Sequence, residues 1–230
     1  MPINPNAVML FAAGFGTRMG SLTAQTPKPL IKVGATALID HTLSWVQALE
    51  PIQKVANTHY LAEQLHAHLA TSNVQISHET PEILDTGGGL RHALPLLGNG
   101  PIYTSNTDAI WHGPNPFELA RAAWQPEKMD GLLVCISKES AIGHTGPGDF
   151  IISENTPITR GSGAIYGGVQ IIKTDLLHSI PEARFSLNLL WDKMIASQRL
   201  FGLTYPGKWC DVGSAKGIKL AEDLLGETDV

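Results

Sequence analysis

Short apolar runs alternate along this chain with segments in which apolar residues recur every three to four positions. The first run, Ala7–Ala12, is apolar throughout, which is typical of a parallel strand buried on both faces. A helical period follows between Ile39 and Leu49. The same reasoning predicts further strands at Lys54–Thr58, Val74–Ser77, Pro101–Ser105, Gly131–Ser137, Asp149–Ser153, Ala164–Lys173 and Leu200–Tyr205, and further helices at Ala62–Ala70, Leu90–Leu97, Phe117–Trp124, Leu187–Ser197 and Ala215–Leu225.

This alternation of strands and helices predicts an α/β fold with a mainly parallel sheet. The second half of the chain is less regular than the first. No linker, repeat or low-complexity stretch separates the two halves in the sequence. We therefore expect one domain over residues 1–230, with an embedded subdomain on the substrate side.

Composition narrows the range of functions. The chain has 230 residues, of which 43% are hydrophobic and 16% charged, so it can bury a substantial core. Its formal net charge of -5 argues against a general nucleic-acid-binding protein, because the phosphate backbone requires a basic surface. A local basic pocket for a small phosphate ligand remains compatible with this charge.

The compartment can also be predicted from the sequence. No apolar run approaches the ~20 residues of a transmembrane helix, and residues 1–6 lack the basic segment of a secretion signal. The two cysteines, Cys135 and Cys210, lie far apart and match no zinc or redox spacing. We therefore expect a protein of the reducing cytoplasm, without a membrane partner.

Two glycines, Gly14 and Gly16, follow the first predicted strand. Open α/β sheets bind their ligands at the carboxyl ends of strands, and glycines let backbone N–H groups approach phosphate oxygens. Arg18 adds a fork of donors that matches phosphate. A lone Gly-x-Gly is a weak signal, however, because it fits a plain strand-to-helix turn equally well.

The segment Thr26–Leu30 (TPKPL) sharpens this interpretation. Pro27 and Pro29 rule out the long helix that would follow a dinucleotide-binding loop, which argues against a dinucleotide-dependent oxidoreductase. The pattern of a Walker A loop is also absent from the sequence. The prolines hold Lys28 on a stiff segment, from which its side chain can return to phosphates at the glycine loop.

Together, Ala12–Met19 (AAGFGTRM) and the TPKPL segment resemble the signature of sugar-1-phosphate nucleotidyltransferases. The resemblance implies a Rossmann-like three-layer α/β/α sandwich with an inserted sugar-binding region. It also implies transfer of a nucleotidyl group from a nucleoside triphosphate to a sugar 1-phosphate, with release of pyrophosphate. The residues that it assigns to the triphosphate are Ala12, Ala13, Gly14, Gly16, Thr17, Arg18 and Lys28.

Such a reaction brings two anions together, so their charge must be neutralised, usually by Mg²⁺ held by carboxylates. Asp108 follows the predicted strand Pro101–Ser105, and Asp211 lies near the end of the chain. Either aspartate alone would more often be a cap or turn residue. As a pair they resemble the two metal-binding aspartates of the family, and the resemblance makes Arg18, Lys28 and Asp108 the catalytic residues.

Further motifs concern the base and the sugar. The cluster Asp85–Gly89 (DTGGG) could let a flat base lie against open backbone amides at a helix start. The resemblance assigns this task to Thr86, Gly87 and Gly88. On the sugar side it points to Asn106, Asp149 and Gly168, and Glu79 is a further candidate there.

The Gly146–Phe150 (GPGDF) and Trp209–Gly213 (WCDVG) elements are most similar to those of family members that use UTP and N-acetylmuramic acid 1-phosphate. Pro147 stands where these members are expected to carry arginine, so the acceptor stays open. The alternatives are mannose or glucose 1-phosphate with GTP or dTTP, and phosphocholine with CTP. A different class, a non-catalytic nucleotide-binding regulator, is disfavoured because Arg18, Lys28, Asp108 and Asp211 are retained.

Overall fold

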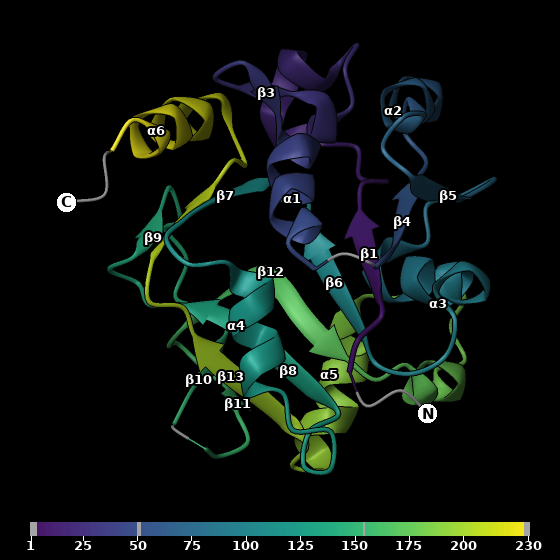
Figure 1. The fold of residues 1–230 in the computed structure, drawn as a ribbon, viewed down its shortest axis with the longest axis vertical. Helices are drawn as coiled ribbons and strands as arrows, with labels where there is room; N and C mark the ends of the chain where they lie inside the picture. The colour runs from purple at the N-terminus through teal and green to yellow at the C-terminus, as the bar shows by residue number, and fades with distance from the viewer. Residues whose placement is uncertain (1–3, 50–51, 154, 228–230) are drawn as a thin grey trace.

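A seven-stranded sheet forms the centre of the computed structural model, which describes residues 4–49, 52–153 and 155–227 (Figure 1). Its strand order is β13-β8-β12-β6-β1-β4-β5. The strands are β1 (Ala7–Phe11), β4 (Gln53–Thr58), β5 (Val74–His78), β6 (Ile102–Asn106), β8 (Gly131–Ile136), β12 (Ile165–Ile172) and β13 (Leu200–Thr204). Strand β12 runs antiparallel to β6 and β8, whereas the other neighbours are parallel. The predicted mainly parallel sheet is therefore confirmed.

Helices cover both faces of this sheet. On one face lie α1 (Leu38–Gln47), α2 (Ala62–Leu69) and α4 (Pro116–Ala123), and on the other α3 (Asp85–Leu97) and α5 (Leu187–Ala196). Successive side chains of β1 alternate between the two cores, because strand side chains point to opposite faces. The three-layer α/β/α arrangement is confirmed. In the described parts of the chain, no helix is long and apolar enough to cross a membrane.

A second, three-stranded sheet carries the last part of the chain. It consists of β7 (Ala109–His112), β14 (Lys208–Asp211) and β9 (Ala141–Ile142), with β14 in the middle. Helix α6 (Ala215–Leu225) follows β14 and packs in a separate core beside it. The hydrophobic pattern did not predict these short strands. The remaining strands form two small ribbons, β2 (Lys32–Val33) with β3 (Thr36–Ala37) and β10 (Phe150–Ile151) with β11 (Thr159–Arg160).

The structure confirms one local prediction and corrects two others. Between β1 and α1 the chain forms two 3-10 helices, Thr17–Thr23 and Lys28–Leu30, as expected of a proline-stiffened segment without a long helix. The strand predicted from Asp149 is only the two-residue β10. Helix α3 begins at Asp85, so the three glycines lie inside its first turns rather than before it.

Candidate functional site

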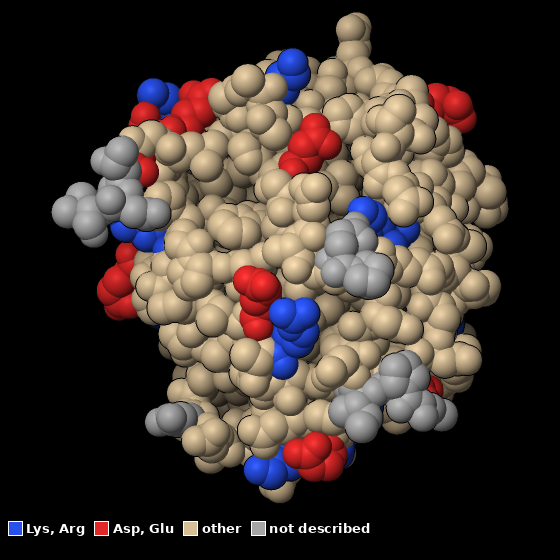
Figure 2. Space-filling model, viewed as in Figure 1, with Lys and Arg blue, Asp and Glu red and all other residues tan. Residues whose placement is uncertain are grey.

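Charged side chains are not evenly distributed over this protein. On the face drawn in Figure 2, lysine and arginine side chains lie apart from one another, several of them beside acidic residues. By contrast, two cations and two carboxylates meet at the ends of β1 and β6, where Lys28 contacts Asp108 and Arg18 contacts Asp211. This concentration of charge marks the candidate site.

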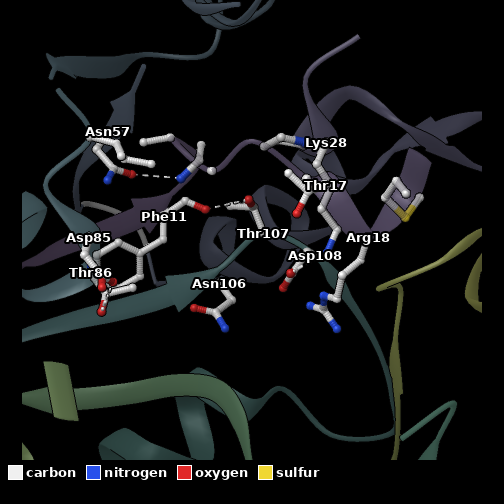
Figure 3. Close-up of a pocket in the computed structure, with 17 residues that line it drawn as sticks. Phe11, Thr17, Arg18, Lys28, Asn57, Asp85, Thr86, Asn106, Thr107 and Asp108 are labelled. Carbon is white, nitrogen blue, oxygen red and sulfur yellow. Dashed lines mark hydrogen bonds and ion pairs between the residues drawn. The ribbon is translucent and has the colours of Figure 1, made fainter. Parts of the chain in front are cut away.

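A pocket of about 330 Å³ opens at the carboxyl ends of β1, β4 and β6. This is the edge at which a parallel sheet is expected to hold its ligand. It is lined by most of the residues that the sequence singled out, namely Ala12, Ala13, Gly14, Gly16, Thr17, Arg18, Lys28, Thr86, Asn106 and Asp108. Figure 3 shows Arg18, Lys28 and Asp108 on one side of the pocket, with Asp85 and Thr86 on the other.

The glycine loop and Lys28 pack directly against each other. Gly16 has a φ of 66°, in the left-handed region that favours glycine. A Cβ at this position would lie 3.0 Å from the Cβ of Lys28 and 2.8 Å from Thr23 Cγ2. The Thr23 hydroxyl also donates to the Gly16 carbonyl over 3.0 Å. Lys28 therefore lies beside the glycine loop and lines the same pocket, and its contact with a phosphate stays a prediction.

Two ion pairs in the site differ in length and in exposure to solvent. Lys28 Nζ lies 2.6 Å from Asp108 Oδ2, and the lysine side chain is only 10% exposed. Arg18 NH1 lies 3.6 Å from Asp211 Oδ2, and the arginine side chain is 69% exposed. Exposed pairs of this kind contribute little to stability, so Arg18 can leave Asp211 at low cost.

Asp108 and Asp211 are brought together by the second sheet. Strand β14 pairs antiparallel with β7, and the Val212 amide donates to the Asp108 carbonyl over 3.1 Å. Thr107 donates its hydroxyl to the Phe11 carbonyl over 2.8 Å. The hydrogen bond of Thr107 to Phe11 and that of Asp108 to Val212 thus fix the segment that follows β6, and Asp108 with it.

The electrostatics of the carboxylate pair favour a cation. Burial raises the pKa of Asp211, and the negative charge of Asp108 raises it further, while Arg18 and Lys28 act in the opposite direction. Burial and the charge of Asp211 raise the pKa of the neighbouring Cys210 thiol to about 11. At neutral pH this thiol is therefore protonated and uncharged.

The donor set fits Mg²⁺ shared with a phosphate ligand. Mg²⁺ is usually bound by one or two carboxylates together with the phosphates of the substrate. Among the described residues, no group of three or more histidine, cysteine or acidic side chains could hold a metal by itself. Asp108 and Asp211 therefore suit a metal that arrives with a nucleotide.

Gly87 and Gly88 do not present open amides to the pocket. Both of their N–H groups donate to the Phe185 carbonyl, over 2.9 and 3.0 Å. The prediction that these two amides are free to bind a base is wrong, because the chain segment before α5 occupies them. Their neighbours Asp85 and Thr86 line the pocket instead, and the Thr86 hydroxyl also accepts from the Leu187 amide over 2.9 Å.

We expect Gly88→Ala to lower the free energy of unfolding by about 1–3 kcal/mol, even without any ligand. The added Cβ would lie 2.5 Å from the Ala183 carbonyl oxygen, which is backbone and cannot move cheaply. This overlap should outweigh the roughly 1 kcal/mol that alanine gains in a helix. Urea unfolding measures the effect. Gly14→Ala is the control, because a Cβ there meets nothing within 4 Å, and equal midpoints for both variants would contradict the packing role.

The residues predicted for the sugar side lie beside the pocket. Gly168 occupies an irregularity of β12, and a Cβ there would lie 3.0 Å from the Cβ of Asn106. Asp149 Oδ2 accepts the Tyr166 amide over 2.8 Å, two residues before Gly168. Asn106 lines the pocket, whereas Asp149 and Gly168 do not. The structure thus brings Asn106 and Gly168 together and ties Asp149 to the same strand.

Seven of the residues that line the pocket were not assigned a role from the sequence: Phe11, Met19, Pro29, Asn57, Ile83, Asp85 and Thr107. A usable signal existed for Asn57, since it is a polar residue near the end of an apolar strand, like Asn106. Asp85 is the first residue of the Asp85–Gly89 cluster, and it has a φ of 61°, which is uncommon for a residue other than glycine. No pattern in the sequence marks Phe11 or Ile83.

Comparisons with known proteins identify the family of the chain. The sequence model of the MobA-like NTP transferase domain matches residues 8–174. The N-acetylmuramate alpha-1-phosphate uridylyltransferase of Caulobacter vibrioides is 37% identical over 97% of this chain and 98% of its own length. The enzyme of the same name from Neisseria meningitidis serogroup B is 29% identical over 95% of this chain and 97% of its own.

A solved structure shows the same fold. The structure of HddC from Yersinia pseudotuberculosis complexed with GMP-PN has a TM-score of 0.76 and 16% sequence identity. The superposition covers 96% of this chain and 99% of that one. At this identity the likeness concerns the fold, and it supports the Rossmann-like α/β architecture expected from the sequence.

Proposed function

Because the chain belongs to the MobA-like NTP transferases, as one of the sugar-1-phosphate nucleotidyltransferases, we propose that it transfers a uridylyl group from UTP to N-acetylmuramic acid α-1-phosphate. The products are UDP-N-acetylmuramic acid and pyrophosphate. The family predicted from the sequence is confirmed by the matched domain and by the relatives. The choice of donor and acceptor rests on the names of the two relatives with nearly full-length matches.

The observation that carries the proposal is the meeting of Arg18, Lys28, Asp108 and Asp211 beside a glycine loop. The loop amides and the two cations suit the negative charge of a triphosphate. The two carboxylates suit a divalent cation, which we propose is Mg²⁺. Such a site can neutralise the negative charge of two phosphates that must approach each other.

In the proposed reaction, a phosphate oxygen of the acceptor attacks the α-phosphorus of UTP. The bond from that phosphorus to the oxygen bridging to the β-phosphate breaks, and pyrophosphate leaves. Lys28 and Arg18 hold the charge on the triphosphate, and Asp108 and Asp211 hold Mg²⁺, which when bound neutralises charge on the reacting phosphates. The acceptor phosphate is already ionised at neutral pH, so the chain needs no general base.

The remaining residues are assigned by their place around the pocket. Thr86 and Asp85 lie across the pocket from Lys28 and Arg18, so we assign them to the base side (Figure 3). Asn106 stands between the two sides. Together with Gly168 and Asp149 it forms the proposed acceptor side.

A matrix of nucleoside triphosphates against sugar 1-phosphates, monitored by pyrophosphate release, tests the proposal. We expect the highest kcat/KM with UTP and N-acetylmuramic acid 1-phosphate in the presence of Mg²⁺. N-acetylglucosamine 1-phosphate is the matched control, because it lacks only the lactyl ether. Turnover with another pair but none with this one would contradict the substrate assignment. Nucleotide binding without pyrophosphate release from any pair would favour the non-catalytic alternative.

A further inference from the structure

A buried carboxylate, Glu79, lies between the two sides of the pocket, although sequence reasoning placed it with the sugar. Its side chain is 0% exposed. Oε1 accepts the side-chain amide of Asn57 over 2.7 Å, and Oε2 accepts the backbone amide of Leu84 over 2.7 Å. Burying an acidic group in this way is costly unless its oxygens are satisfied, so the arrangement requires an explanation.

The chain of hydrogen bonds continues from Asn57 to the glycine loop. Asn57 Oδ1 accepts the Ala12 amide over 2.8 Å (Figure 3). Both ends of this chain, Ala12 and Leu84, are backbone N–H groups that can only donate. Asn57 must therefore turn its oxygen toward Ala12 and its NH₂ group toward Glu79, and Glu79 must accept at both oxygens. We call Ala12, Asn57, Glu79 and Leu84 the relay.

The relay connects the two sides of the pocket. Ala12 opens the loop that is assigned to the triphosphate, and Leu84 directly precedes the base-side residues Asp85 and Thr86. Asn57 itself lines the pocket between them. Through Asn57, one buried carboxylate thus connects two loops that are distant in the sequence.

The surroundings of Glu79 leave its carboxylate little freedom. Its amide donates to the Thr58 carbonyl over 2.8 Å, and its carbonyl lies 2.9 Å from His59 Nδ1. On the opposite side, a Cβ at Gly89 would collide with Glu79 Oε1 and would lie 2.9 Å from Asn57 Nδ2. Gly89 therefore provides the space for the relay, which gives the third glycine of the cluster a role of its own.

We propose that Glu79 and Asn57 are positioning residues that preorganise the nucleotide pocket, an inference that rests on the proposed function. They do not touch the reacting atoms. They hold the Ala12 and Leu84 amides in place before the nucleotide binds, so that binding does not have to order the two loops. The relay should therefore act on nucleotide affinity and KM more than on kcat.

The order of donors and acceptors suggests an experiment in which the side-chain amide and the carboxylate are swapped between positions 57 and 79. In Glu79→Gln, the new NH₂ group must face another donor, either Asn57 or Leu84. In Asn57→Asp, two carboxylates face each other at neutral pH. In the double variant N57D/E79Q, the new aspartate accepts from both Ala12 and the new amide, whose oxygen accepts from Leu84. Only the double variant restores every hydrogen bond, with the same total charge.

Calorimetry with Mg²⁺ and UTP, GTP, CTP or dTTP first identifies the triphosphate that the wild-type protein binds most tightly. Each single variant should bind this nucleotide roughly tenfold or more weakly, because a buried polar group is left without a partner. The double variant should recover only part of the affinity, because it restores the hydrogen bonds but places a carboxylate in the lining of the triphosphate pocket. Hydrogen exchange at the Ala12 and Leu84 amides should be faster in the single variants and slow again in the double variant. Glu63→Gln, at a side chain that is 96% exposed, is the matched control.

Single variants that bind like the wild type would overturn the relay while leaving the proposed function intact. A double variant whose Ala12 and Leu84 amides exchange as fast as in the single variants, or that does not fold, would also overturn it, because its hydrogen bonds remain complementary. A wild-type protein that binds no triphosphate would contradict the proposed function, and the relay's role with it.

Discussion

Asp108→Asn is expected to lower kcat/KM roughly 100- to 1000-fold while leaving the fold intact. The substitution removes a negative charge from the pair that is proposed to hold Mg²⁺, and it also weakens the 2.6 Å contact with Lys28. Some stability should also be lost, because the substitution leaves Lys28, whose side chain is only 10% exposed, without its carboxylate partner. Pyrophosphate release gives the kinetic effect, and thermal unfolding shows whether the fold is retained.

Asp223→Asn provides a matched control for this variant. Asp223 lies on α6, is 59% exposed, and pairs with Lys219 over 2.8 Å. The same change of charge at this exposed pair should leave kcat/KM unchanged. Near-wild-type turnover of the Asp108 variant would show that this carboxylate does not hold the metal, and would require another explanation for its contact with Lys28.

Lys28→Met is expected to have two effects of opposite sign. Affinity for the triphosphate should fall, and kcat/KM should drop about 100-fold or more, because a preorganised cation is lost from the pocket. Affinity for Mg²⁺ in the absence of nucleotide should rise, because Asp108 no longer has its cationic partner. Methionine keeps most of the aliphatic stem, which packs against Gly16, so the loop itself should remain in place.

Titrations of this variant with Mg²⁺ alone and with UTP alone separate the two effects. Lys219→Met is the control, since its side chain is 72% exposed and lies on α6. Weaker binding of both ligands would indicate a general loss of structure rather than a loss of one charge. Unchanged UTP affinity would contradict the role of Lys28 at the phosphates.

Several features of the site could be predicted from contiguous residues. The apolar run that forms β1 ends at the glycine loop, so the location of the pocket follows from the rule that parallel strands present ligands at their carboxyl ends. Pro27 and Pro29 exclude a long helix whatever the rest of the chain does, because proline lacks an N–H group and has a fixed φ. The place of Lys28 followed from these two local facts.

The glycine cluster shows where such local reasoning ends. Glycine at Gly87 and Gly88 is compatible with an approaching base, but equally with an approaching chain segment, and the sequence does not distinguish them. In the structure, the Phe185 carbonyl accepts hydrogen bonds from both of these amides. Gly89 instead faces Glu79, which no local pattern connects to it.

By itself, the sequence determined the α/β class, the family and the place of the glycine loop, since each depends on residues that are neighbours along the chain. Only the tertiary structure decided that Asp211 meets Asp108, through the register of β14 with β7, and that Glu79 is linked to Ala12 through Asn57. The physical reason is the same in both cases. A hydrogen bond or ion pair between distant residues depends on strand register and packing, which the whole chain sets together, and a one-residue shift in pairing would separate the partners.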